Sequence, residues 1–285
     1  MDRMRPMTTV LPSGACNAHC HVFGPRERFP YAANASFVPA VDAPREALYA
    51  LNDRLGLHRC VVVQSACHGF DNTVTQDALA GRPGAYRGIA LLPTDVPESE
   101  LKRLDAAGFR GVRFNYMRHL GRPTPIDEVL RLARRFAPLG WHLQLHGDPG
   151  MLTELAQAIA SAPVPVVIDH IGRIDASRGL DQPDFSVLRR LLDHDHVWVK
   201  VSGIDRISAE GPPYADALPF ARALVAEQGD RVLWGNDWPH PNHRGPVPDE
   251  DLLVALIYEI APTEAARQRL LVDNPHQLYR FGDEA

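Results

Sequence analysis

The sequence has few cysteines and no long apolar segment. Its four cysteines, Cys16, Cys20, Cys60 and Cys67, form no C-x-x-C pair, so their spacing does not suggest a zinc ribbon and we expect reduced thiols. No apolar run approaches the roughly 20 residues that a membrane span needs, and none follows the early arginines of the N-terminus. We therefore expect neither a signal peptide nor a membrane anchor, and a cytoplasmic location.

The sequence also has fewer basic than acidic residues. The 285 residues include 30 Lys and Arg against 35 Asp and Glu, a formal net charge of -5, and contain no basic run. Phosphate binding needs clustered excess of Lys and Arg, so the sequence argues against a nucleic-acid partner. The motifs G-x-G-x-x-G and G-x-x-x-x-G-K-[ST] open none of the helices, which weakens a nucleotide-binding alternative. A small anion can still bind, because nearby arginines outweigh a distant net charge.

What the sequence does contain is an alternation of short apolar runs with amphipathic segments. Runs such as CVVVQ and RVLWGND are typical of parallel strands that are buried on both faces. We predict strands at residues 15–21, 59–64, 86–91, 111–115, 142–146, 166–170, 197–202 and 232–237. We predict helices at residues 44–55, 98–107, 126–136, 151–159, 185–192 and 249–260.

Eight strands that alternate with helices favour a closed α/β barrel, the (β/α)8 or TIM barrel, over an open doubly wound sheet. The chain length is usual for this fold, and the sequence shows no linker, tight repeat or shift in composition. We therefore expect a single domain over residues 1–285. The stretch after Thr263 is predicted to form an extra helix packed on the outside of the barrel.

Polar side chains recur at the C-terminal ends of the predicted strands. They are His19, His21, Gln64, Arg113, Asn115, His146, His170, Ser202 and Asp237. In a (β/α)8 barrel these ends converge on one mouth, where the catalytic groups of the fold lie. The sequence therefore predicts an active site at this mouth.

Four histidines can contribute to that site. His19 and His21 are two apart in a strand, so both imidazoles face the same way and can reach one metal ion or one carbonyl oxygen. His146 ends its strand, and His170 ends VVIDH. The same alternation predicts that Asp169, beside His170, faces outward toward the helices or lies between strands.

Asp237 ends the last predicted strand, in WGNDWPHPN. A carboxylate at that depth is costly unless it is paired, so we expect it to be functional, as a general base toward water or as a metal contact. His240 either orients Asp237 or caps the loop. His142 begins the strand that His146 ends, at the opposite end of the barrel, and is predicted to be structural.

Arginines supply cationic donors that match carboxylates. Arg113 faces the barrel axis by alternation, and Arg118, Arg173 and Arg206 are expected near the same mouth. The segment CHGFDN after the second strand offers His68, whereas its Asp71 or Asn72 can simply cap the following helix.

Together these segments resemble a known family. NAHCHVFGP, VVVQSACHGFDN, GVRFN, VIDHIGR, VKVSGIDR and VLWGNDWPHPN, with RFPYAANASFVPA after the first strand, resemble the pyrone-dicarboxylate hydrolase branch of the amidohydrolase superfamily. The match runs in order through nearly the whole chain. The resemblance implies a distorted barrel that adds water to a small anionic lactone, either 2-pyrone-4,6-dicarboxylate or a related (sulfo)muconolactone.

The resemblance also implies roles for individual residues. His19, His21 and His170 would polarise the lactone carbonyl, and Asp237 would activate water. Substrate contacts are implied for Arg113, Arg206, His68, Ser65, Arg118 and His146. In the family pattern a tyrosine stands where this chain has Phe37, an arginine where it has His119, and a tyrosine where it has His146. The lactone can therefore be a relative of the pyrone, such as a sulfomuconolactone, a muconolactone or a sugar-acid lactone.

The resemblance leaves the cofactor open. His19, His21, His146 and Asp237 follow the ligand order of mononuclear superfamily members, which suits Zn²⁺, whereas the pyrone branch implies no metal. Rival functions are a zinc-dependent decarboxylase, a lactone isomerase and a protein that only binds an anionic metabolite. We expect a small anionic lactone as the partner, no nucleic acid and no membrane, and a homo-oligomer is compatible with the sequence.

Overall fold

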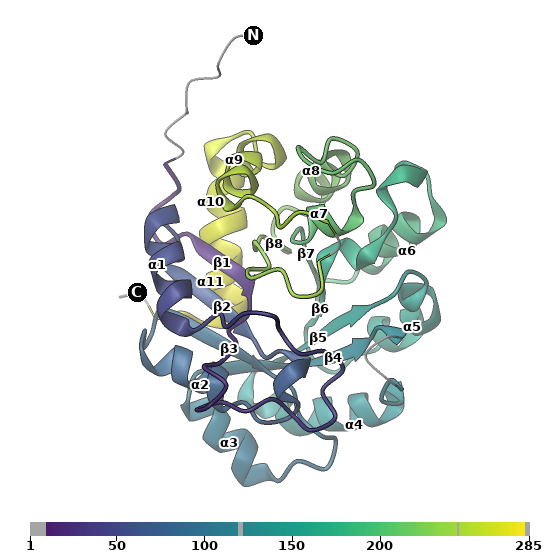
Figure 1. Cartoon of the computed structure of the whole chain (residues 1–285). Coiled ribbons are helices and arrows are strands. Elements are labelled where there is room, and N and C mark those ends of the chain that lie inside the picture. Colours follow the sequence, from purple (N-terminus) through teal and green to yellow (C-terminus); the bar gives the residue numbers. More distant parts are fainter. Residues whose placement is uncertain (1–9, 119–121, 244, 283–285) are drawn as a thin grey trace.

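The chain forms a barrel of eight parallel strands inside a ring of helices (Figure 1). The computed structural model describes residues 10–118, 122–243 and 245–282. Each strand pairs in parallel with the next along the chain, which confirms the predicted TIM barrel. The strands are β1 (Cys16–Cys20), β2 (Arg59–Val63), β3 (Tyr86–Ala90), β4 (Phe109–Tyr116), β5 (His142–Gly147), β6 (Val166–Ile168), β7 (Val197–Lys200) and β8 (Val232–Leu233).

The six predicted helices are present, and their ends lie within two residues of the predicted ones. They are α1 (Arg45–Leu55), α3 (Glu98–Ala106), α4 (Ile126–Phe136), α5 (Met151–Ala160), α6 (Pro183–Leu191) and α9 (Glu250–Ile260). Three more helices lie outside the predicted ranges: α2 (Thr73–Ala80), α7 (Ile204–Ile207) and α8 (Leu218–Glu227). Among the described residues, none of the helices combines the length and the apolar character that a bilayer crossing requires.

The seam between β8 and β1 is closed by main-chain hydrogen bonds just beyond the short last strand. Ala18 N donates to Trp234 O over 2.8 Å, and Asp237 N donates to His19 O over 2.9 Å. Gly235 permits this approach, because a Cβ atom at Gly235 would lie 2.5 Å from the main-chain N of His19. The first and last strands are therefore held together near their C-terminal ends.

The lower end of the barrel is filled by the C-terminus of the chain. The extra helix predicted after Thr263 is present as α10 (Glu264–Gln268) and α11 (Asn274–Tyr279), joined by one π-helical turn. Its end, however, does not lie outside: Leu278, Tyr279 and Phe281 form one cluster with inward-facing side chains of the strands, among them Val61, Val167 and Trp198. These side chains exclude water from the end of the barrel opposite the mouth.

Candidate active site

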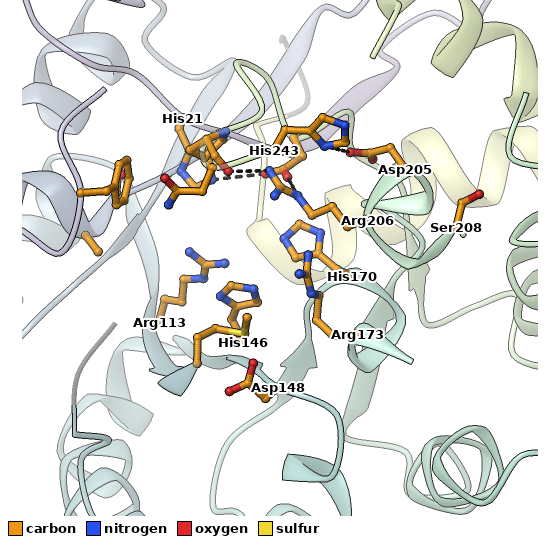
Figure 2. A pocket seen from close by; sticks show the side chains of 17 residues that line it. His21, Arg113, His146, Asp148, His170, Arg173, Asp205, Arg206, Ser208 and His243 are labelled. Atoms are coloured by element: carbon orange, nitrogen blue, oxygen red, sulfur yellow. Dashed lines mark hydrogen bonds and ion pairs between the residues drawn. The ribbon is translucent and has the colours of Figure 1, made fainter. Parts of the chain in front are cut away.

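A cavity of about 730 Å³ opens at the C-terminal ends of the strands (Figure 2). Eight of the residues that the sequence predicts for the mouth line it: His21, Ser65, Arg113, His146, His170, Arg173, Arg206 and Asp237. His19 lies directly beneath, fully buried. Residues at or just after the ends of β1, β2, β4, β5, β6 and β8, together with Arg206 of α7, thus meet at one mouth.

The two histidines of β1 both reach Asp237. His19 Nε2 lies 3.5 Å and His21 Nε2 lies 3.3 Å from Asp237 Oδ1. The register of β1 against β2 shifts between Asn17 and Cys20, and the Sγ atom of Cys20 points the other way, 3.1 Å from Cys60 Sγ. All four cysteines are buried free thiols, as predicted.

Asp237 lies in the turn after β8, where its main chain is left-handed with φ 64°. Its Oδ2 atom pairs closely with Arg206 Nε, and Arg206 Nη2 also donates to Pro241 O over 3.1 Å. Burial alone would raise the pKa of Asp237, but Arg206 and His170, with a hydrogen bond from His21, hold that pKa well below its usual range. The carboxylate is therefore ionised at neutral pH.

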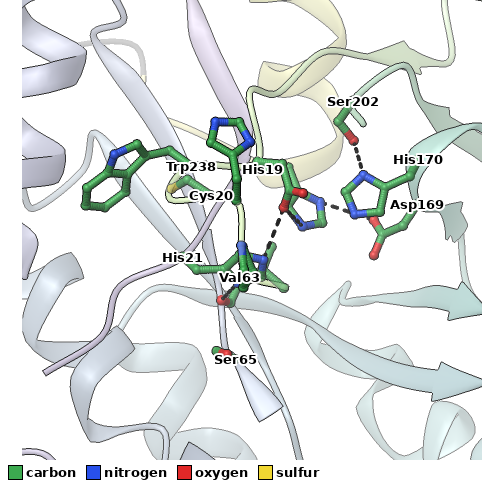
Figure 3. Close-up of polar contacts among 12 residues, drawn as sticks. His19, Cys20, His21, Val63, Ser65, Asp169, His170, Ser202 and Trp238 are labelled. Carbon is green, nitrogen blue, oxygen red and sulfur yellow. Dashed lines mark hydrogen bonds and ion pairs between the residues drawn. The ribbon is translucent and has the colours of Figure 1, made fainter. Parts of the chain in front are cut away.

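A left-handed turn after β6 carries two side chains to the cavity. Four successive residues, from His170 to Arg173, have φ angles of 50°, 53°, 65° and 56°. This conformation costs roughly 1–2 kcal/mol per non-glycine residue, so it persists only because the surroundings enforce it. His170 Nδ1 lies 2.9 Å from Ser202 Oγ, and its ring centre is 4.6 Å from that of His19 (Figure 3). Burial lowers the pKa of His170 well below 6.5, which leaves a neutral imidazole.

The prediction that Asp169 faces outward is wrong. Asp169 Oδ2 accepts from Arg113 Nε over 2.9 Å and from Gln144 Nε2 over 3.0 Å, inside the barrel. Val167, two residues before it, also faces the interior, so strict alternation places Asp169 inside. His170 reaches the cavity only because the strand ends at Ile168 and the chain then turns left-handed.

Sequence reasoning missed Lys200, the last residue of β7. Its side chain is fully buried, and its Nζ atom lies 3.5 Å from Asp169 Oδ1. Trp198, two residues earlier, faces the interior, so the period-two pattern of the strand contains the signal that places Lys200 inside.

A second acid–imidazole pair lies in the cavity wall. Asp205 Oδ2 is 3.1 Å from His243 Nδ1, and both residues line the cavity (Figure 2). No sequence pattern indicates this pair, because its two residues come from distant segments, α7 and the loop after β8.

Three guanidinium groups line the cavity. Arg113 is paired with Asp169 and Arg206 with Asp237, whereas Arg173 has no hydrogen bond or ion pair within the described part of the chain. Burial lowers the pKa of Arg173, and the nearby Arg206 lowers it further. An anionic group that enters the cavity therefore meets a cation without a partner.

Some predicted residues do not reach the cavity. His68 lies under the loop after β1, with its Nδ1 atom 3.1 Å from Pro30 O and its ring against Tyr31. The Arg118 side chain is 89% exposed beside Asp148. His240 lies 2.9 Å from Glu250 of α9, so it fixes the loop to a helix rather than orienting Asp237. His119 is outside the described residues.

The donor set fits a divalent ion poorly. His19, His21 and Asp237 offer ligand atoms within 4.8 Å of one another, as do His19, Asp169 and His170, but His146 belongs to neither set. The His146 Nδ1 atom lies 3.1 Å from Asn115 Oδ1. More importantly, the two buried carboxylates already pair with Arg113, Lys200 and Arg206. A divalent ion would add two positive charges where the cations already outnumber the carboxylates.

Comparison with known proteins agrees with this architecture. The amidohydrolase family model matches residues 16–281. The chain is 46% identical to a 2-pyrone-4,6-dicarboxylate hydrolase of Comamonas testosteroni, over 94% of this chain and 91% of the relative. It is 40% identical to a 4-sulfomuconolactone hydrolase of Rhizobium radiobacter, over 97% and 93%. The structure of a putative 2-pyrone-4,6-dicarboxylic acid hydrolase from Pseudomonas putida superposes with a TM-score of 0.83 at 34% identity, covering 95% of this chain and 99% of that one. The chain belongs to the amidohydrolase family.

Proposed function

We propose that the protein hydrolyses a small lactone that carries at least two anionic groups. The observation that carries this proposal is the buried, ionised Asp237, in contact with two imidazoles, at the floor of a cavity lined by three arginines. The relatives named above, which are hydrolases of a pyrone dicarboxylate and of a sulfomuconolactone, support the same substrate class.

In this mechanism a water molecule bound at Asp237 attacks the lactone carbonyl carbon. Asp237 takes a proton from the water as the new C–O bond forms. His19 and His170, whose rings are neighbours, donate hydrogen bonds to the developing oxyanion. The ring C–O bond then breaks, and the proton passes to the departing oxygen or to the new carboxylate group. All steps use side chains that the cavity already brings together.

The arginines would bind the anionic groups of the substrate. Arg173 has no partner to give up, whereas Arg206 must exchange Asp237 for a substrate carboxylate. That exchange would remove the strongest attractive charge from Asp237, raise its pKa and make it a better base. Binding of the correct anion would thus activate the general base. Phe37 lines the same cavity without a hydroxyl group, so selectivity at this wall rests on shape.

The test is the substitution Asp237→Asn combined with a panel of acidic lactones. We expect the wild-type protein to open 2-pyrone-4,6-dicarboxylate or 4-sulfomuconolactone, and D237N to lose about 10²–10⁴-fold in kcat with an unchanged fold by circular dichroism. Asp251→Asn, at a carboxylate that is 70% exposed, is the matched control and should retain full activity. NMR of the product distinguishes an open-chain acid from an isomerised lactone or a decarboxylated product. A fully active D237N would overturn the proposal.

A further inference from the structure

Lys200 is a buried cation that the mechanism above does not use. Its side chain is 0% exposed and lies beneath His19 at the centre of the barrel. Three atoms surround its Nζ atom: Gln144 Oε1 at 2.9 Å, His19 Nδ1 at 3.3 Å and Asp169 Oδ1 at 3.5 Å. An ammonium group has three N–H donors and no lone pair, so this environment satisfies it only if His19 Nδ1 accepts one of them.

His19 Nδ1 has one alternative, which is to carry a proton and donate it to Asp169 Oδ1 at 3.3 Å. The proton would then face Lys200, also a donor, and one N–H of the buried ammonium would have no acceptor. The other side of the ring gives the same answer. His19 Nε2 faces Asp237 Oδ1, and within the described residues Nε2 has no hydrogen-bond partner unless it carries the proton.

His21, the other histidine of the pair, is held by a different contact. Its Nδ1 atom lies 2.7 Å from the carbonyl oxygen of Val63, which can only accept, so Nδ1 carries a proton. The His21 Nε2 atom faces Asp237 and the cavity. Burial, and then the charge of Lys200, lower the pKa of His19 to about 3, so its ring is neutral at pH 7 and carries one ring proton.

We propose that Lys200 is a positioning residue that fixes His19 in the Nε2–H tautomer, so that His19 donates to the substrate carbonyl. The tautomer follows from contacts within the chain alone. The donation to a carbonyl rests on the proposed hydrolysis. The same tautomer withholds the Nε2 lone pair that a metal ion would need from His19, so Lys200 also opposes metal binding by this pair.

The first experiment uses the wild-type protein without substrate. In the two-bond ¹H–¹⁵N correlation spectrum of the ¹⁵N-labelled protein at pH 7, the ring of His19 is identified as the one missing from His19→Gln. We expect its pattern to be that of the Nε2–H tautomer. An Nδ1–H pattern for His19 would overturn the proposal, whether or not the protein hydrolyses lactones.

The second experiment replaces the ammonium with an apolar side chain of similar length, Lys200→Met. Asp169 then becomes the sole partner of His19 Nδ1, so the tautomer should change to Nδ1–H. The loss of one oxyanion donor should lower kcat about 10²–10³-fold with little change in KM. The freed Nε2 lone pair should let K200M retain one Co²⁺ after desalting, which wild-type protein should not.

Gln144→Met is the matched control in the same buried layer. It removes one acceptor of Lys200 but leaves the contact between Lys200 and His19, so the His19 tautomer should not change. If Q144M changes the tautomer as K200M does, or if K200M retains the Nε2–H form, then Lys200 does not set it. If K200M does not fold, an Nδ1–H pattern of His19 in the wild-type spectrum still overturns the proposal.

Discussion

Arg206 has to serve two anions in turn. In the unliganded site it pairs with Asp237, and in the proposed complex it pairs with a group of the substrate. Its guanidinium therefore affects both the affinity for the substrate and the basicity of the carboxylate.

Arg206→Met should separate these effects in the pH profile. Loss of the cation raises the pKa of Asp237, and the base acts only when ionised, so the acid limb of kcat/KM should move to higher pH. KM for a dianionic lactone should rise about tenfold or more, because a charge-assisted contact is lost. Both parameters come from steady-state kinetics between pH 4 and 8. Arg222→Met, at an exposed pair with Glu259, is the control. An acid limb that stays in place would show that Arg206 does not tune Asp237.

At the same scale, the sequence predicted eight of the 17 residues that line the cavity. Period-two alternation and the convergence of strand ends were sufficient for His21, Arg113 and Asp237. The orientation predicted for Asp169 was wrong because the strand was expected to continue to an inward-facing His170. Instead β6 ends at Ile168, and a left-handed turn that no sequence pattern indicates brings His170 to the cavity. Lys200 was missed because a lysine at a strand end reads as a surface residue until the inward register of its strand is known.

At the scale of elements, the fold depends on a close approach between the first and the last strand. The sequence predicted all eight strands and six helices, because buried parallel strands and amphipathic helices have strong periodic signals. It did not predict α2, which begins with β-branched residues, or α8, which has a proline as its second residue and is apolar on most sides. The sequence also did not indicate that β8 approaches β1 closely at Gly235, where there is no room for a side chain.

Gly235→Ala should weaken this seam. The added Cβ atom would lie 2.5 Å from the main-chain N and 2.7 Å from the Cβ of His19, and main chain cannot yield as a flexible side chain can. We expect a loss of about 1–3 kcal/mol or more in the free energy of unfolding, measured with urea, together with a lower kcat. Gly282→Ala, where a Cβ atom meets nothing within 4 Å, should be neutral. Equal stability of G235A and G282A would refute the close packing at the seam.

The C-terminal helix α11 can be tested through Tyr279, which is fully buried at the lower end of the barrel. Its hydroxyl has no hydrogen-bond partner in the described structure, so Tyr279→Phe should be neutral or slightly stabilising. Tyr279→Ala opens a cavity and should cost about 3–5 kcal/mol in thermal or urea unfolding. Both variants should keep wild-type KM at low temperature, since the site lies at the opposite end. A strongly destabilised Y279F would reveal a partner for the hydroxyl.

At the scale of the whole molecule, buried neutral imidazoles should make the fold sensitive to acid. The pKa values of His19 and His142 are lowered to about 3, and those of His146 and His170 are well below 6.5, in each case chiefly by burial. The unfolded chain takes up these protons near pH 6.5 and the folded chain does not. Stability is therefore full above pH 6.5 and falls as the pH drops toward 3, by up to about 1.4 kcal/mol per pH unit for each imidazole.

His142→Phe tests the contribution of one buried imidazole to this pH dependence, at a histidine outside the site. In the part of the chain that the structure describes, neither ring nitrogen of His142 has a hydrogen-bond partner, so an aromatic ring without nitrogens should fit at little cost at pH 7.5. Urea unfolding at pH 7.5, 6.0 and 5.0 should show that the variant loses stability less steeply as the pH falls. The difference in slope should be at most the uptake of one proton, which is about 1.4 kcal/mol per pH unit. Asp169 and Asp237, whose pKa values are also lowered, should contribute only below about pH 4. Identical slopes for both proteins would exclude His142 as a contributor.

The seam between β1 and β8 also governs when activity can arise during synthesis. Asn236 N donates to the side chain of Asn17, 219 positions earlier, and the adjacent residues supply the base and its imidazole partners. Contacts between such distant segments form late, after the intervening loop entropy has been overcome. A ribosome must therefore release almost the entire polypeptide before a single turnover can occur, and a prematurely terminated product is catalytically silent rather than partly active.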